Sequence, residues 1–514
     1  MANIVVCADG TWNTPDDKED EIPAPTNVVK LYNSLDSQDE NGIEQKKYYH
    51  PGVGTDGTWW QRLGGGGVGL GLGDNIKSAY KWLAVNYRPE DKIFLFGFSR
   101  GAYTVRSLGG MVSSCGLLDL SSSELSDDTI WNLVDDMFNC YRAGKRAPAA
   151  PKGMSFHNPD ARKRGAHTTK IHFVGVWDTV GALGIPDDMG VLNLIDNPRH
   201  HSFHDTELSD TVLNARHAVA IDEQRHTFAP TLWSNIDQQR KRTVKQVWFP
   251  GVHSDVGGGY AVTGLSDGAL DWMMGEAGAL GLLFRAGARD QLHPDPRSLL
   301  HNSLTGVFAK LKSRPRNVPA FKKASTEFHR SAIDRHDNPP LYEATYWPSR
   351  SLRRNEAVGL DIFARQHWNA TGLYLEGGKK YSFTALGQWL DSGIKSGPGG
   401  SGDGKFELKE AFHVASSGLG KLEGLFGKIT GNQEADFLWT KRVENLPWFV
   451  LVGVIANGIG ADPKGRLVDH ETFKIGEGVE YAPKRSGYLF CFANDAWHAY
   501  DNNKGSVRLT VKRL

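Results

Sequence analysis

Cysteine is scarce in this chain: four residues are scattered over 514 positions, and none of them form a pair with metal-ligand spacing. We therefore expect no disulfide framework, and we expect Cys7 and Cys491, which lie in predicted strands, to be small buried residues. Long apolar runs are also missing. Residues 448–459 are too few to span a bilayer and include Gly453 and Asn457, so no transmembrane segment is predicted.

The chain also has no excess of positively or negatively charged residues. Lys and Arg together number 59, and so do Asp and Glu, so no overall field attracts nucleic acid or an anionic membrane. The chain opens on an apolar strand at residues 4–8, without the basic segment and apolar core of a signal peptide. We expect synthesis in the cytoplasm and no nucleic-acid partner.

Strand and helix signals alternate through the first half of the chain. Strands are predicted at residues 4–8, 47–49, 92–96, 171–177 and 244–249, and helices at 27–35, 74–87 and 102–111, the second of them beginning at Asp74. Such alternation predicts an α/β fold with a mostly parallel sheet covered on both faces. In such sheets, binding and catalytic sites form at the carboxyl ends of the strands.

The most informative motif surrounds Ser99, which follows an apolar strand in the sequence Gly-Phe-Ser-Arg-Gly. A strand, Gly-x-Ser-x-Gly and a helix in this order are typical of a nucleophile elbow, which holds a serine hydroxyl at the edge of the sheet. Glycines flank the serine because side chains there would block the tight turn. The motif therefore predicts an α/β-hydrolase that uses a serine nucleophile.

A serine nucleophile needs a base, and the base needs an acid, which follow in this fold in the order serine, acid, histidine. Asp178 directly follows one predicted strand, and His253 lies in the loop after another. Asp255 is the alternative acid, although it lies so close to His253 in sequence that it would more easily brace the loop. Four other histidines are interpreted as structural or surface residues: His217, His226, His301 and His329.

The oxyanion formed in such a reaction needs two backbone N–H donors. We expect one from Arg100, the residue after the nucleophile, and the other from Gly10 or Thr11 in the loop after the first strand. Asp9 is expected to orient that loop. The glycine run at residues 64–73 lacks the Lys-Ser/Thr of a phosphate-binding loop and is interpreted as a loop or lid near the elbow.

The sequence Asp9-Gly10-Thr11 also suggests a different enzyme class, the aspartyl-phosphate phosphatases of the haloacid dehalogenase type. Those enzymes need an aspartate nucleophile two residues before Asp9, and this chain has Cys7 there. The alternative therefore fails at its essential residue.

The C-terminal part follows a different pattern. From about residue 361, short alternating strands punctuated by Gly, Asp and Asn predict an all-β sandwich. We expect a catalytic domain over residues 1–355, and a second domain over 356–514 with a helical insertion near 408–429. The segment 285–354, rich in Arg, Lys, His and Pro, is predicted to be a lid or another elaboration, and its individual charges are interpreted as solvated.

Five ordered motifs resemble the bacterial and fungal α/β-hydrolase family marked by Gly-Phe-Ser-Arg-Gly-Ala, which includes type VI secretion phospholipase effectors. They are residues 9–13 (DGTWN), 97–102 (GFSRGA), 177–181 (WDTVG), 220–225 (AIDEQR) and 248–259 (WFPGVHSDVGGG). The resemblance implies Ser99, Asp178 and His253 as the triad and a lipid acyl ester as the substrate. It also implies secretion by a contact-dependent system, with a secretion-apparatus or immunity partner.

The C-terminal part resembles the calcium-dependent galactophilic lectins of pseudomonads at residues 368–373 (WNATGL), 387–390 (GQWL) and 494–506 (NDAWHAYDNNKGS). Side-chain oxygens of Asp495, Asn502 and Asn503, with the carbonyl of Ala499, suit Ca²⁺; the alternative is that they only build turns. The histidine loop with which the lectins grip sugar has no counterpart at residues 397–404.

The expected function is hydrolysis of a carboxylic ester, preferably of a phospholipid, without a catalytic cofactor. The C-terminal domain is expected to dock to a glycan, a membrane surface or a partner. Two alternatives stay open. One is a carbohydrate-directed esterase or deacetylase, and the other is a glycan-binding protein whose hydrolase core is vestigial.

Overall fold

The computed structural model describes residues 1–10, 18–38, 42–52, 72–121, 125–144, 155–158, 169–181, 207–234, 236, 243–391, 394–401, 441–459 and 467–514. Its N-terminal unit is built around a six-stranded sheet in the order β4-β1-β5-β6-β7-β8, in which every neighbouring pair is parallel. The strands are β1 (Asn3–Ala8), β4 (Gln45–His50), β5 (Lys92–Phe98), β6 (Ile171–Trp177), β7 (Ala215–Ala220) and β8 (Val244–Phe249). The prediction of an α/β fold with a mostly parallel sheet is confirmed.

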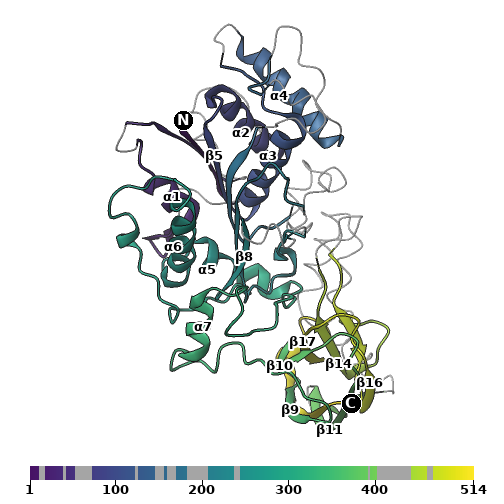
Figure 1. Cartoon of the computed structure of the whole chain (residues 1–514). Coiled ribbons are helices and arrows are strands. Elements are labelled where there is room, and N and C mark those ends of the chain that lie inside the picture. The colour runs from purple at the N-terminus through teal and green to yellow at the C-terminus, as the bar shows by residue number, and fades with distance from the viewer. Residues whose placement is uncertain are drawn as a thin grey trace.

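Helices cover both faces of this sheet (Figure 1). One face packs against α2 (Leu72–Asn86), α3 (Arg100–Cys115) and α4 (Asp127–Arg142), and the other against α1 (Asn27–Ser34) and α6 (Gly264–Gly278). Helix α2 begins two residues before Asp74, which lies in its first turn, so the prediction that the helix begins at Asp74 is wrong.

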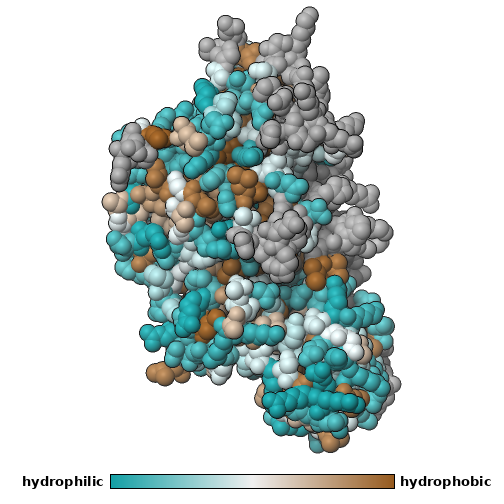
Figure 2. Space-filling view, viewed as in Figure 1, coloured by the Kyte–Doolittle hydropathy of each residue, from teal (hydrophilic) through white to brown (hydrophobic). Residues whose placement is uncertain are grey.

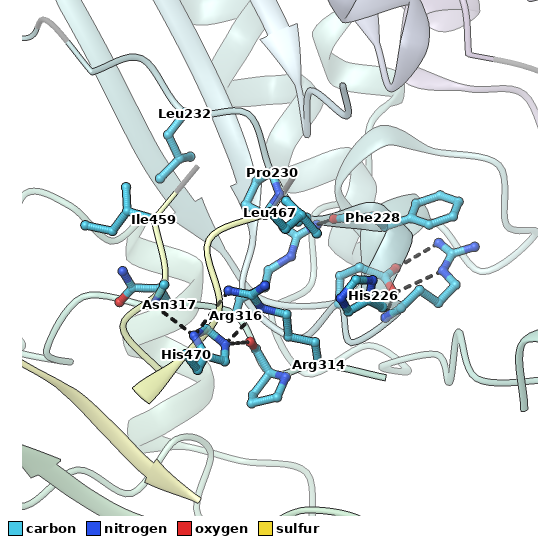
Figure 3. A pocket seen from close by; sticks show the side chains of 15 residues that line it. His226, Phe228, Pro230, Leu232, Arg314, Arg316, Asn317, Ile459, Leu467 and His470 are labelled. Atoms are coloured by element: carbon cyan, nitrogen blue, oxygen red, sulfur yellow. Dashed lines mark hydrogen bonds and ion pairs between the residues drawn. The ribbon is translucent and has the colours of Figure 1, made fainter. Parts of the chain in front are cut away.

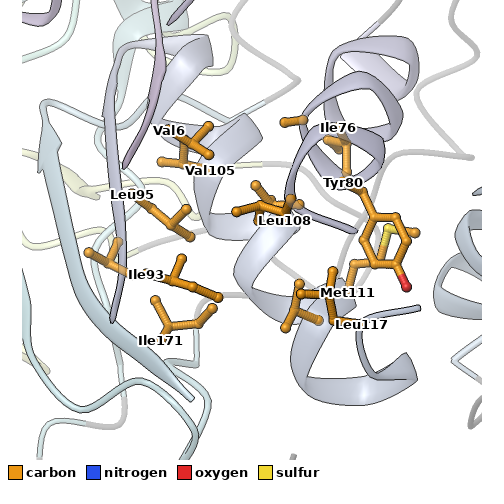
Figure 4. Packing of buried hydrophobic residues seen from close by; sticks show 14 of the residues in the cluster. Val6, Ile76, Tyr80, Ile93, Leu95, Val105, Leu108, Met111, Leu117 and Ile171 are labelled. Atoms are coloured by element: carbon orange, nitrogen blue, oxygen red, sulfur yellow. The ribbon is translucent and has the colours of Figure 1, made fainter. Parts of the chain in front are cut away.

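Alternate residues of the strands supply the two cores because successive strand side chains point to opposite faces. Val6 and Leu95 belong to the core under α2 and α3, whereas Val5 and Phe94 belong to the core under α1 and α6. Figure 4 shows the first of these cores. Burial on both faces explains why β1 and β5 read as continuous apolar runs.

The remaining elements of the N-terminal unit are short. They are the hairpin of β2 (Lys18–Glu19) and β3 (Ile22–Pro23), the helices α5 (His253–Gly257) and α7 (Arg330–Asp337), and the 3-10 turns η5 (His226–Phe228), η7 (Arg289–Gln291) and η8 (Gly306–Lys310). Helix α5 directly follows the carboxyl end of β8 and therefore begins at the sheet edge where a site was expected.

The C-terminal module consists of two five-stranded antiparallel sheets. One contains β10 (Asn369–Leu375), β13 (Gly399–Ser401), β14 (Trp448–Ala456), β15 (Glu471–Lys474) and β17 (Gly487–Ala493), and the other β9 (Ala357–Phe363), β11 (Tyr381–Asp391), β12 (Ile394–Ser396), β16 (Gly478–Tyr481) and β18 (Asn503–Arg513). The short η10 (Tyr500–Asn502) precedes β18. Side chains from both sheets share one core, including Trp389 and Leu451, so the predicted β-sandwich is confirmed.

Figure 2 shows a mostly hydrophilic outer surface on this module. The domain boundary near residue 355 and the role of 285–354 as a lid stay predictions, and the predicted helical insertion at 408–429 lies outside the described residues.

An apolar cluster joins the two parts of the molecule. Val219 and Trp248 of the parallel sheet pack with Phe328 of the segment 285–354 and with Phe490 of β17. Polar contacts add to the joint: the Trp368 indole N–H donates to the Ser313 hydroxyl at 2.9 Å. The segment 285–354 thus connects the two parts through buried side chains.

Among the described helices, none has both the length and the apolar character needed to cross a membrane. Cys7 and Cys491 are buried free thiols within β1 and β17, as predicted.

Candidate active site

Ser99 occupies a strained turn between β5 and α3. Its backbone angles are φ +58° and ψ −121°, a conformation that L-residues rarely adopt. Its side chain makes no capping bond to α3, so the helix does not use the hydroxyl. The turn therefore holds the serine at the carboxyl end of β5 and at the positive end of a 16-residue helix.

Two glycines make this turn possible. A Cβ on Gly97 would lie 2.5 Å from the Gly101 carbonyl oxygen, and a Cβ on Gly101 would lie 2.1 Å from the Ala8 carbonyl oxygen. The second distance also shows that the end of β1 lies against the first turn of α3. The motif thus requires glycine for a close approach of three backbone segments.

Substituting Gly101 with alanine is therefore expected to destabilise the protein by more than about 3 kcal/mol, because two backbones would have to separate. Gly109, in the same helix, is the matched control, since a Cβ there would meet only Leu95 at an ordinary 3.8 Å. Gly109→Ala is expected to keep or raise the free energy of unfolding, measured by urea denaturation. Equal effects of the two substitutions would contradict the close packing at Gly101.

Asp178 and His253 meet at the ends of β6 and β8. The imidazole Nδ1 lies 2.5 Å from Asp178 Oδ2, and both side chains are buried. Because Nδ1 faces a carboxylate, we assign the ring proton to Nδ1, which leaves Nε2 as the free acceptor. This is the orientation that a general base requires.

The imidazole lies beside the elbow. Its ring centroid is 4.5 Å from that of Phe98, the residue before Ser99, and 4.9 Å from that of Phe228. Among the described residues, no hydrogen bond joins the Ser99 hydroxyl to His253. Catalytic bonds of this kind are commonly long before substrate binds.

Arg316 holds the acid from the other side. Its Nη1 donates to Asp178 Oδ1 at 2.6 Å and its Nη2 to Oδ2 at 2.8 Å, while the same guanidinium also donates to the carbonyl oxygens of Ala220 and Phe228. Burial alone would raise the pKa of Asp178, but the charge and hydrogen bonds of Arg316 hold it well below its usual range. Asp178 is therefore a carboxylate at any physiological pH.

Burial lowers the pKa of His253, and the hydrogen bond and charge of Asp178 oppose that effect without cancelling it. The imidazole is consequently neutral at neutral pH and can accept a proton. A neutral base next to a fixed carboxylate can activate a hydroxyl nucleophile.

The motif after β7 braces the histidine loop. Glu223 accepts from the His253 backbone N–H at 3.2 Å and from the Arg225 side chain. Burial would raise the pKa of Glu223, but Arg225 outweighs it and the pKa falls to about 2. Asp222 accepts from the Gly251 backbone N–H at 2.7 Å, and burial raises its pKa to about 6.

Asp255, the alternative acid, bonds elsewhere. Its carboxylate accepts from the Val252 backbone N–H and lies 2.6 Å from His301 Nδ1, and no hydrogen bond to the His253 ring is made among the described residues. Asp255 thus braces the loop, which is the role that its closeness in sequence favours.

The backbone N–H groups expected to donate to the oxyanion differ in whether they already have an acceptor. The Gly10 backbone N–H donates to Asp9 Oδ1 at 2.7 Å, so it would have to leave that acceptor to reach an oxyanion. Asp9 also accepts from the hydroxyls of Thr26 and Tyr49, which fixes its carboxylate at the end of β1. Arg100 is the first residue of α3, whereas Thr11 lies outside the described residues, as does the glycine run up to residue 71.

The other histidines serve local structure. His217 accepts from the Thr179 backbone N–H, His329 caps α7, and His301 stacks on Tyr260 beside Asp255. Burial lowers the pKa of His217 to about 3, which keeps it neutral. These contacts fit the structural interpretation of the three residues.

Two charged residues of the segment 285–354 overturn the expectation that its charges are solvated. Arg316 is buried against Asp178, and Arg335 is buried in an ion pair with Glu343. Nothing near Arg316 in the sequence signals its partner, which lies 138 residues away.

Of the candidate calcium ligands, Asp495 and Asn503 are buried, Ala499 is partly buried and Asn502 is exposed. Asn503 Nδ2 donates to Asp495 Oδ2 at 2.8 Å, and Asn502 Nδ2 donates to Asp391 Oδ1 at 2.9 Å. Asn503 Oδ1 is buried, and no described residue donates a hydrogen bond to it. Ala499 lies in the same loop, just before η10. Hard oxygen donors and an orphaned amide oxygen fit Ca²⁺, and Asp391 is a further candidate ligand that no sequence motif indicates.

The model of a protein family described as "T6SS, Phospholipase effector Tle1-like, catalytic domain" matches residues 2–276, more than half of the chain. An uncharacterized protein of Saccharomyces cerevisiae is 31% identical over 240 residues, which cover 44% of this chain and 32% of that protein. The chain therefore spans about a third of the length of this curated relative.

Three solved structures show weaker likeness. An uncharacterized protein from Pseudomonas aeruginosa is 21% identical over 56% of this chain and 47% of its own (TM-score 0.34), and the Tle1 effector bound to the VgrG spike of the type 6 secretion system is 20% identical over 51% of each chain (TM-score 0.29). The EclA N-terminal domain, a PllA-like lectin, is 15% identical over 31% of this chain and 95% of its own (TM-score 0.18).

Proposed function

Because the chain belongs to the family of Tle1-like phospholipase effectors of the type VI secretion system, we propose that it hydrolyses a carboxylic ester of a phospholipid with Ser99 as nucleophile. The observation that carries the proposal is the 2.5 Å contact between Asp178 and His253 beside a serine held at φ +58°. A neutral imidazole oriented by a carboxylate beside a strained serine is suited to acyl transfer.

In the proposed reaction, His253 Nε2 takes the proton of the Ser99 hydroxyl as its oxygen attacks the ester carbonyl. The Arg100 backbone N–H, at the positive end of α3, stabilises the oxyanion. His253 then gives its proton to the departing alcohol, and an acyl-serine remains. Water, deprotonated by the same imidazole, releases the carboxylic acid and restores Ser99.

A substrate panel tests the ester class. The protein is given a diacyl phospholipid, an acylated sugar and p-nitrophenyl butyrate, and the fastest release of acid is expected from the phospholipid. Preference for the acylated sugar would support the carbohydrate-directed esterase instead. Glycan binding without turnover of any ester would support the vestigial core.

The pH dependence follows from the state of the base. Since burial lowers the pKa of His253 below its ordinary 6.5, kcat/KM is expected to rise with pH and to reach half its plateau below pH 6.5. Below that pH the imidazolium cannot accept the serine proton. A half-maximal value well above pH 6.5 for an uncharged ester would contradict the assignment of His253 as the base.

Family membership also supports contact-dependent secretion, so we propose that a component of the secretion apparatus carries this chain and that an immunity protein opposes it. The C-terminal module is proposed as a docking module. Binding of the chain to a spike protein of its own secretion system, in pull-down from purified components, would test the first partner.

We propose that Asp495, Asn502 and Asn503 hold a structural Ca²⁺, with the carbonyl of Ala499. Chelation is then expected to lower Tm by about 5 °C, because loss of a ligand bound at about 100 times its Kd removes about 2.7 kcal/mol. Asp495→Asn is expected to abolish the response.

Asp501→Asn is the matched control for the calcium test, because Asp501 belongs to the same loop but its side chain is 97% exposed. This variant is expected to keep the response to chelation. Equal Tm with and without chelator in the wild-type protein would contradict the calcium site.

A further inference from the structure

A cavity of about 50 Å³ lies between the N-terminal unit and the C-terminal module, and Ser99 does not line it. Its walls come from the loop after β7, from the segment around Arg314 and from both sides of the β14–β15 connection, including Ile459 and His470 (Figure 3). Three of its lining residues contact the candidate triad: Phe228 packs against the His253 ring, Arg316 binds Asp178, and Glu223 accepts from the His253 backbone N–H. The cavity is therefore a neighbour of the base.

Three arginines line this cavity, and one of them differs from the others. Arg225 is paired with Glu223, and Arg316 with Asp178. Arg314 donates instead to neutral acceptors, at 3.1 Å to a ring nitrogen of His470 and at 2.6 Å to a backbone carbonyl oxygen. Within the described part of the chain, no carboxylate lies within ion-pair distance of Arg314.

Burial and the charge of Arg314 both act on the histidines of the cavity. Burial and then the charge of Arg314 lower the pKa of His226 to about 4 and that of His470 to about 3. Both rings are therefore neutral at neutral pH. Asp469 is the nearby carboxylate, and it acts on Arg314 only through its charge, without an ion pair among the described residues. A bound anion would contact the Arg314 guanidinium, which is already partly desolvated.

The opposite wall is apolar. Phe228, Pro230, Leu232 and Ile459 line it, and Ile459 is 54% exposed. The cavity thus combines a cationic side chain with an apolar wall. An amphiphile with an anionic group suits this combination better than a wholly polar ligand.

We propose that this cavity binds a phosphate group, with Arg314 as its main ligand, and that the group belongs to the phospholipid substrate; the assignment to substrate rests on the function proposed above. Arg is suited to phosphate because its planar guanidinium donates two parallel hydrogen bonds. A headgroup held next to the base would use binding energy to position the ester.

The test compares two esters that differ in the phosphate. The ratio of kcat/KM for phosphatidylglycerol to kcat/KM for diacylglycerol, both in mixed micelles, is measured for the wild type and for Arg314→Gln. The substitution is expected to lower this ratio about tenfold, because only one ester carries the group that Arg314 binds. Arg314→Lys, which keeps the charge but loses the two parallel donors, is expected to restore only part of it.

Arg297→Gln is the matched control, because Arg297 belongs to the same segment but its side chain is 65% exposed and does not line the cavity. Titration calorimetry with inorganic phosphate gives a readout independent of activity. If Arg314→Gln binds phosphate more weakly than the wild type but has the same ratio of kcat/KM for the two esters, the cavity is a site for free phosphate and not for the substrate.

Unchanged phosphate affinity together with an unchanged substrate ratio in Arg314→Gln would overturn the proposal. Failure of the proposed function gives a different result: the wild type would hydrolyse neither ester, while phosphate binding and its dependence on Arg314 could still be measured. Titration calorimetry therefore tests whether the cavity binds phosphate, independently of whether the protein hydrolyses either ester.

Discussion

Replacing Ser99 with alanine is expected to lower kcat on a phospholipid by at least about 10⁴-fold, since removal of a triad nucleophile leaves only binding and oxyanion stabilisation. Alanine has the same backbone preferences as serine at φ +58°, and Ser99 makes no capping bond, so Tm should change little. Fatty-acid release and thermal unfolding measure the two effects.

Ser114→Ala is the control for this substitution, because Ser114 lies in the same helix α3 and is exposed. It is expected to retain wild-type kcat and Tm. Phospholipid turnover in Ser99→Ala within tenfold of the wild type would show that another group attacks the ester.

The second large effect concerns Arg316. Arg316→Met removes the ion-pair partner of the buried Asp178 carboxylate. The substitution is therefore expected to destabilise the protein by about 3–5 kcal/mol and to lower kcat by about 100-fold. Because Asp178 would no longer be neutralised by Arg316, its charge would stabilise the imidazolium, and the acid limb of the pH profile should move to higher pH. Arg316→Lys should show smaller changes in the same direction.

Arg335→Met separates positioning from plain stability. Arg335 is as deeply buried, is paired with Glu343 and lies in the same segment, but it contacts no candidate triad residue. It is expected to lose comparable stability while its pH profile stays in place. If Arg316→Met and Arg335→Met had the same pH profile, Arg316 would be only a structural residue.

The sequence was sufficient for the elements whose signals are local. The apolar run before Ser99 and the small residues after it predict the strand, the turn and the helix, and the structure has all three. The sheet order then brings Ser99, Asp178 and His253 to one edge, because their strands β5, β6 and β8 are parallel and close together.

Other features have no local signal. The strand β7 was not predicted because its short sequence contains Arg216 and His217, both of which are buried by partners far away in the chain. Arg316 looked like one charge among many in a basic segment. Its guanidinium is satisfied by Asp178 and by the carbonyl oxygens of Ala220 and Phe228, and none of these partners follows from its neighbours in sequence.

The C-terminal module likewise combines features that the local sequence predicts with features that it does not. Alternating apolar residues predict its strands, and the structure confirms two antiparallel sheets around one core. The packing of β17 on the parallel sheet was not predicted, because the face carrying Phe490 reads simply as another apolar strand face. The cavity beside Arg314 is lined by residues of both parts of the molecule, so no local sequence pattern predicts it.

The central claim is that Ser99 attacks the ester after His253 accepts its proton. Treating the active protein with a fluorophosphonate and locating the adduct by mass spectrometry tests it most directly, since the reagent is attacked by an activated serine and stays attached. One adduct on Ser99, formed much more slowly in His253→Ala, is the predicted result. Modification of a different residue, or full phospholipid turnover by protein already modified at Ser99, would contradict the account.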